Sequence, residues 1–147
     1  MSFVKRVERV ALAVPSLEQA REYFEKCFGA KFLPIELIED MGIRYQPFEI
    51  GASKMELLEA TRDDSPVAKF LKSNGRPGVH HITYEVDDID AAVKEFESRG
   101  GRIAYRHTYK PGVTFEGYVW REAFVHPKDA YGVLIHFAEK KPVNSGQ

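Results

Sequence analysis

The chain of 147 residues lacks several features that would place it in a specialised class of protein. Its single cysteine, Cys27, excludes an internal disulfide and predicts a cytoplasmic protein, with Cys27 itself a small packing residue. No apolar run approaches the roughly 18–20 residues of a membrane helix, and the N-terminus lacks the apolar core of a signal peptide. The net charge is −1 without a basic tract, so neither nucleic acid nor membrane is expected as a partner.

What the chain does contain is an internal repeat. Hydrophobic residues make up 44% and charged residues 29%, as in an ordinary globular protein. Residues 79–96, VHHITYEVDDIDAAVKEF, repeat residues 7–24, VERVALAVPSLEQAREYF, at an offset of 72. Each copy has the pattern of an apolar strand, a turn and an amphipathic helix. Two such halves predict a pseudo-twofold arrangement with a site where the halves meet, and the repeat pairs Arg9 with His81.

Periodicity and turn residues predict two βαβββ modules. In the first module we expect strands at 6–14, 31–38, 43–50 and 54–59, and a helix between the cap Ser16 and the stop Gly29. The second has a helix at 89–98 and strands at 79–86, 102–107, 118–126 and 132–138. A short helix at 65–71 lies in the connector. The predicted domain covers 6–140, with module one at 6–60, connector 61–78 and module two at 79–138, followed by a flexible tail at 141–147.

The last strands of the two modules also align, at an offset of 80, which pairs Glu56 with His136. Arg9, Glu56, His81 and His136 each interrupt an apolar strand. A buried polar side chain without a partner costs roughly 1–3 kcal/mol, so each of the four needs one. Arg9 could pair directly with Glu56 and His136 in a metal-free, salt-bridged cavity, or bind a carboxylate or phosphate of a substrate.

Four stretches carry a resemblance to a known family: VALAVPSLEQA, KMELLEATRDDSPVAKFL, GVHHITYEVDDIDAAV and HPKDAYGVLIHF. From about Val7 to Ala138 the chain resembles the vicinal oxygen chelate (glyoxalase/bleomycin resistance) superfamily and, within it, the methylmalonyl-CoA epimerases. The resemblance implies an α+β fold whose two βαβββ modules form a curved, partly open, eight-stranded barrel-like sheet with helices outside.

The resemblance also implies a divalent metal ion held by the first and last strands of both modules. The four ligand positions that the resemblance implies correspond to Arg9, Glu56, His81 and His136. Arg9 cannot ligate a cation, because its guanidinium has no lone pair to offer. The remaining ligand set is Glu56, His81 and His136, which suits Zn, Co, Mn, Ni or Fe.

Such a metal would stabilise an enolate while an acid and a base move the proton. The family's carboxylate on the third strand falls on Tyr45, and Glu49 shares that strand face. The candidate catalytic residues are therefore Glu56, Tyr45 and Glu49. Arg9 and Trp120, which follows a long loop at 109–118, are the candidate substrate-binding residues. His107 and His126 are expected to be surface or turn residues.

These features favour a metal-dependent isomerase or lyase that acts on a small α-oxygenated carbonyl compound or CoA thioester, and the expected assembly is a homodimer. Two alternatives remain open. One is a non-haem iron dioxygenase that uses the same two histidines and one carboxylate. The other is a metal-free ligand-binding protein of the drug-sequestering type, in which Arg9 holds an anion.

Overall fold

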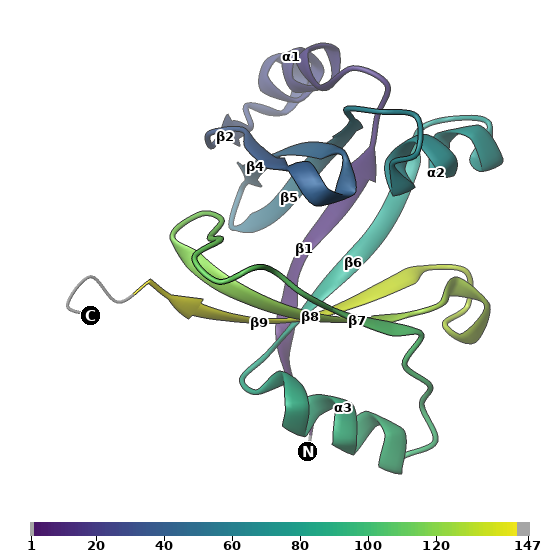
Figure 1. Cartoon of the computed structure of the whole chain (residues 1–147). Coiled ribbons are helices and arrows are strands. Elements are labelled where there is room, and N and C mark those ends of the chain that lie inside the picture. Colours follow the sequence, from purple (N-terminus) through teal and green to yellow (C-terminus); the bar gives the residue numbers. More distant parts are fainter. Residues whose placement is uncertain (1, 144–147) are drawn as a thin grey trace. The chain divides into compact units, whose positions relative to one another are not determined.

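The computed structural model describes residues 2–143 and divides the chain into two compact units. One unit is Arg9–His81; the other combines the N-terminal residues up to Glu8 with the chain from Ile82 onward. The chain passes between the units inside two strands, β1 (Val4–Ala13) and β6 (Gly78–Val86). Figure 1 labels these strands and most of the other elements.

The Arg9–His81 unit contains a sheet with the strand order β2-β4-β5-β1. The strands are β2 (Lys31–Phe32), β4 (Ile43–Ile50), β5 (Ser53–Ala60) and the end of β1, and β3 (Glu36–Ile38) pairs with β4. β1 runs parallel to β5, which places Ala11 beside Glu56. β4 runs antiparallel to β5, which places Pro47 on the other side of Glu56.

Helix α1 (Leu17–Phe28) packs on the sheet of this unit and contributes Leu17 to the apolar core. Ser16 caps it by accepting a hydrogen bond from the Gln19 amide, and Gly29 ends it at a φ of 66°, a conformation that glycine adopts without strain. The core cluster consists of Val14, Leu17, Ala30, Phe48 and Leu57. Since Leu57 and Phe48 point to this cluster, strand alternation turns their neighbours Glu56 and Pro47 to the opposite face of the sheet.

The second unit has the strand order β6-β9-β8-β7. It comprises β6 from Ile82, β7 (Tyr105–Thr108), β8 (Tyr118–Val125) and β9 (Leu134–Pro142). Helix α3 (Ile89–Ser98), capped by Asp88, covers one face through a core cluster made of Val86, Ile89, Ala92, Val93, Ala123, Val125 and Phe137. Alternation therefore directs Glu122, Phe124 and His136 to the face away from α3.

Most elements expected from the sequence are confirmed, including α3 at its predicted bounds. The strand expected at 31–38 is wrong as a single element: it is broken into β2 and β3 around Pro34, which cannot donate a ladder hydrogen bond. The described residues accordingly contain nine strands rather than eight. The connector helix α2 (Pro66–Asn74) is longer than expected, and Ser65 caps it.

Two differences concern the ends of elements. β9 runs to Pro142, so Lys141 and Pro142 of the expected tail lie in a strand, whereas residues 144–147 of that tail lie outside the described residues. Cys27 is exposed on α1, so the prediction that it packs in the core is wrong. Over residues 2–143 no helix is both long enough and apolar enough to span a membrane.

Candidate functional site

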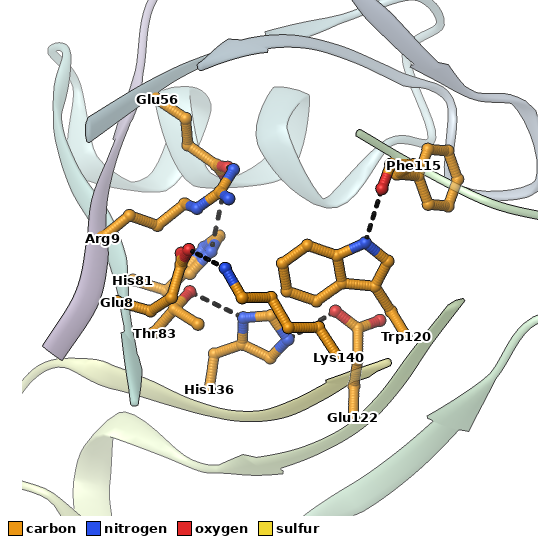
Figure 2. Close-up of polar contacts among 10 residues, drawn as sticks. All are labelled: Glu8, Arg9, Glu56, His81, Thr83, Phe115, Trp120, Glu122, His136 and Lys140. Atoms are coloured by element: carbon orange, nitrogen blue, oxygen red, sulfur yellow. Dashed lines mark hydrogen bonds and ion pairs between the residues drawn. The ribbon is translucent and has the colours of Figure 1, made fainter. Parts of the chain in front are cut away.

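The first polar cluster lies in the Arg9–His81 unit, on the sheet face opposite α1. Arg9 Nη1 donates a hydrogen bond of 2.8 Å to Glu56 Oε1, as Figure 2 shows. Arg9 lies two residues before Ala11, the strand neighbour of Glu56, so alternation turns Arg9 to the face of Glu56. Arg9 and Glu56 expose only 3% and 6% of their surfaces, so they form a buried ion pair. One alternative expected from the sequence paired Arg9 with both Glu56 and His136; the contact with Glu56 is present, and a contact with His136 stays a prediction.

His81 completes this cluster. Its Nε2 lies 3.6 Å from Glu56 Oε2, while its Nδ1 shares a hydrogen bond of 2.9 Å with His80 Nδ1. His80 in turn packs edge-on against Phe70 of α2, with the ring centroids 5.2 Å apart. The two oxygens of Glu56 therefore face different side chains: Oε1 faces the guanidinium of Arg9, and Oε2 faces the imidazole of His81.

The expected catalytic residues of β4 lie in the same unit. Pro47 is the antiparallel partner of Glu56, and Tyr45 is two residues before Pro47, which places the phenol on the face of Glu56. Tyr45 is buried, with 6% of its surface exposed. Glu49 follows Pro47 by two residues and shares that face by alternation, but it is exposed and its strand partner is Lys54.

The Arg9 cluster does not fit a divalent metal ion. Arg9 stands at the first of the four expected ligand positions and offers no lone pair, and its permanent positive charge lies against Glu56 Oε1. Within residues 2–143 no group of three or more histidine, cysteine or acidic side chains is placed to hold a metal ion. His136, the third expected ligand, belongs to the other unit. The joint set Glu56, His81 and His136 stays a prediction.

His136 lies in a second polar cluster, on the face of its sheet away from α3. Its Nδ1 shares a hydrogen bond of 2.8 Å with Thr83 Oγ1, and its Nε2 contacts Glu122 Oε2 (Figure 2). The imidazole also stacks on Phe124, with ring centroids 4.7 Å apart and planes 8° apart. Both nitrogens and one ring face are thereby engaged within this unit, which orients the imidazole.

Glu122 is the residue of this cluster that the sequence analysis missed. Burial raises the pKa of the Glu122 carboxyl, but the charge of His136 and hydrogen bonds from His136 and Tyr109, together with the charge of His107, outweigh burial. The pKa of Glu122 therefore lies below its ordinary value of 4.5. His107 is the strand partner of Glu122 and is half-buried, so its expected place on the surface is wrong.

Trp120, the expected substrate-binding residue, anchors the long loop that precedes it. Its indole Nε1 donates a hydrogen bond of 3.0 Å to the carbonyl of Phe115 (Figure 2). The Lys140 ammonium lies 5.8 Å from the Trp120 ring centroid and 4.8 Å from that of Tyr118, in the range of cation–π contacts. Lys140 also forms an ion pair of 2.9 Å with the buried Glu8.

Comparison with known proteins decides the family. The sequence model of the glyoxalase/bleomycin resistance protein/dioxygenase superfamily matches residues 8–119. The chain belongs to this superfamily. The mitochondrial methylmalonyl-CoA epimerase of Bos taurus is 35% identical over 134 residues, which are 91% of this chain and 74% of that protein.

Solved structures of the superfamily agree. The crystal structure of methylmalonyl-CoA epimerase from Mycobacterium tuberculosis is 31% identical, with a TM-score of 0.82 over 97% of this chain and 92% of that one. A methylmalonyl-CoA epimerase in complex with methylmalonyl-CoA and NH4+ is 32% identical, with a TM-score of 0.79 over 97% and 99% of the two chains. The predicted vicinal oxygen chelate fold and the similarity to methylmalonyl-CoA epimerases are confirmed; these relatives are isomerases.

Membership of the superfamily explains why some site residues could be found from the sequence and others could not. Arg9, Glu56 and His81 were found because their positions match family motifs and the internal repeat. Glu122 has no such match. A signal was nevertheless present, because Glu122 is a charged residue inside the apolar strand YVWREAFV, the same pattern that singled out Glu56 in KMELL.

Proposed function

We propose that the chain is an isomerase that transfers a proton at the carbon next to a CoA thioester carbonyl, as in the epimerisation of methylmalonyl-CoA. Its similarity to methylmalonyl-CoA epimerases over 91% of the chain supports the substrate class. The observation that carries the chemistry is the buried carboxylate of Glu56, held between Arg9 and His81. A carboxylate fixed in this way is a positioned proton acceptor.

The bond between carbon 2 and its hydrogen breaks, the proton moves to Glu56, and the electron pair forms an enolate with negative charge on the thioester oxygen. A proton then returns to carbon 2, and the Tyr45 hydroxyl on the same sheet face is its proposed donor. Return of the proton to the other side of the carbon inverts the centre, and both residues recover their protonation states by exchange with water.

The other predicted site residues keep narrower roles in this proposal. Arg9 binds an anionic oxygen of the substrate, since a planar guanidinium suits carboxylate and enolate oxygens. Trp120 contacts the acyl or CoA portion of the substrate. Glu49, which is exposed, is the weakest candidate for a proton acceptor. A cytoplasmic homodimer remains the proposed state of the protein, and light scattering combined with size-exclusion chromatography would measure its assembly.

The test is deuterium incorporation into methylmalonyl-CoA in D2O, followed by NMR or mass spectrometry. We expect the wild-type protein to exchange the hydrogen at carbon 2, and Glu56→Gln to lower that rate roughly 10²–10⁴-fold, the usual contribution of a general base. Glu97→Gln, on the exposed surface of α3, is the matched control and should exchange at the wild-type rate. Absence of exchange at high concentrations of folded wild-type protein would rule out this substrate and favour a protein that only binds its ligand.

A further inference from the structure

We propose that the guanidinium of Arg9 is the permanent cation of the candidate site, and that it replaces a divalent metal ion there. The proton transfer would then proceed without a metal cofactor. This role of Arg9 rests on the proposed proton transfer, whereas its effect on metal binding can be measured without any substrate.

The backbone dictates where this cation lies. Parallel pairing of β1 with β5 places Ala11 beside Glu56, and Arg9 is two residues earlier on the same face of the strand. Ala11 has a small side chain, which leaves the long arginine side chain room to reach the carboxylate. The resulting contact of 2.8 Å joins two side chains that expose only 4% and 9% of their surfaces.

Charge explains why a metal ion and Arg9 exclude each other. Arginine stays protonated over the whole pH range in which proteins are folded, so its positive charge cannot be removed to admit a second cation. A divalent ion bound to Glu56 Oε2 and His81 Nε2 would lie next to the buried guanidinium that Glu56 Oε1 already binds. Repulsion between like charges at short range and low dielectric opposes this arrangement.

The same charge can serve the reaction. An enolate carries its negative charge on oxygen, and a fixed N–H donor near that oxygen stabilises it more than the neutral thioester. The planar fork of a guanidinium has five N–H donors, and one of them binds Glu56 Oε1 at the edge of the site. Arg9 can therefore orient the carboxylate that accepts the proton and also offer N–H groups to the developing oxyanion.

Metal binding by the purified protein tests this directly. After treatment with a chelator, we expect wild-type protein titrated with Co²⁺ to show no stoichiometric binding by calorimetry and no visible cobalt absorption bands. Arg9→His should instead gain one tightly bound Co²⁺ with such bands, because an imidazole would join Glu56 and His81 as the common set of two histidines and one carboxylate. Arg99→His, on the exposed end of α3, is the matched control and should gain none.

Two further variants keep the test decisive. Arg9→His combined with His81→Ala should lose the gained metal site, and Arg9→Lys, which retains a positive charge, should bind no metal. Stoichiometric binding of Co²⁺ by wild type, abolished by His81→Ala, would overturn the inference. So would a folded Arg9→His variant, verified by circular dichroism, that binds no cobalt; if that variant does not fold, binding by wild type alone decides.

Measurements of the rate of hydrogen exchange distinguish this inference from the proposed reaction. Chelator-treated wild type should retain its rate of hydrogen exchange at carbon 2. In Arg9→Ala this rate should be roughly 10²–10³-fold lower, which is the usual effect of removing an oxyanion donor. A wild-type rate that falls on metal removal and returns on metal addition would overturn the inference. No exchange with or without metal would refute the proposed function, while the cobalt titrations would still decide whether Arg9 replaces the ion.

Discussion

Arg9 and Glu56, which are 47 positions apart in the chain, form a buried ion pair in which Arg9 Nη1 lies 2.8 Å from Glu56 Oε1. A pair of this kind is a weak source of stability as a whole, because the desolvation of both charges offsets their attraction. Loss of one partner is different, since the other is left as an uncompensated buried charge. The pair is therefore expected to be more important for the arrangement of the site than for the free energy of folding.

Removal of Arg9 should destabilise the protein strongly. We expect Arg9→Ala to lower the free energy of unfolding by about 3–5 kcal/mol, because Glu56 then remains buried without its cation. Glu56→Gln in the same background should recover part of this loss, so the two effects should not add. Urea unfolding measures both. The control is Arg99→Ala, whose exposed pair with Glu95 should be worth only about 0.2–1 kcal/mol. Strictly additive losses would contradict a direct Arg9–Glu56 coupling.

Tyr45→Phe should slow the inversion of carbon 2 of methylmalonyl-CoA without unfolding the protein. The substitution removes only the hydroxyl proposed to return the proton, and loss of a general acid typically costs roughly 10²–10⁴-fold in rate. The measurement is the rate at which one pure epimer of methylmalonyl-CoA is converted into the other at saturating substrate, alongside a thermal melt of each variant. Tyr23→Phe, on the exposed side of α1, removes an equivalent hydroxyl outside the site and serves as the control. An unchanged rate in Tyr45→Phe would assign the proton donor elsewhere.

Stability should fall with acid in a way that depends on Glu122. Its pKa is lower in the folded protein than the ordinary value of 4.5, so folding favours the ionised carboxylate. The stabilisation that Glu122 provides is therefore complete above pH 4.5 and is lost as the pH falls below it. Glu122→Gln, which cannot ionise, should be less stable than wild type at neutral pH and should lose less stability on acidification. Urea unfolding from pH 6.5 downward, with Glu97→Gln as the exposed control, measures the difference; parallel curves for wild type and Glu122→Gln would refute it.

Trp120→Phe should loosen the loop at 109–118. The carbonyl of Phe115 accepts hydrogen bonds from the Trp120 indole and from the Tyr118 amide, and phenylalanine would remove the first. A hydrogen bond of this kind contributes about 0.5–1.5 kcal/mol, so the Phe115 and Tyr118 amides should exchange faster in D2O. Hydrogen exchange followed by mass spectrometry checks this, with α3 as the internal reference. If Trp120 also lines the substrate, KM should rise in the same variant.

Local patterns were enough to predict most of the elements. The amphipathic period and caps of α3 predicted residues 89–98, which are the observed bounds, because capping and helical periodicity depend on neighbouring residues. The expected strand at 31–38 failed for a reason also present in the sequence, since Pro34 interrupts it. The length of β9 was underestimated because Lys140 and Lys141 are polar, although Lys140 is held by Glu8 and two aromatic rings.

The candidate site was predictable only in part. The internal repeat and the family motifs identified Arg9, Glu56, His81 and His136 as polar residues within apolar strands, which is information that the order of residues contains. Which partner each of them takes depends on strand pairing between distant segments. Parallel pairing of β1 with β5 brings Arg9 to Glu56, and antiparallel pairing of β7 with β8 sets His107 opposite Glu122. Contacts between residues far apart in the chain arise only when the sheet forms. The Arg9–Glu56 pair and the ionised state of Glu122 are therefore determined by the tertiary structure.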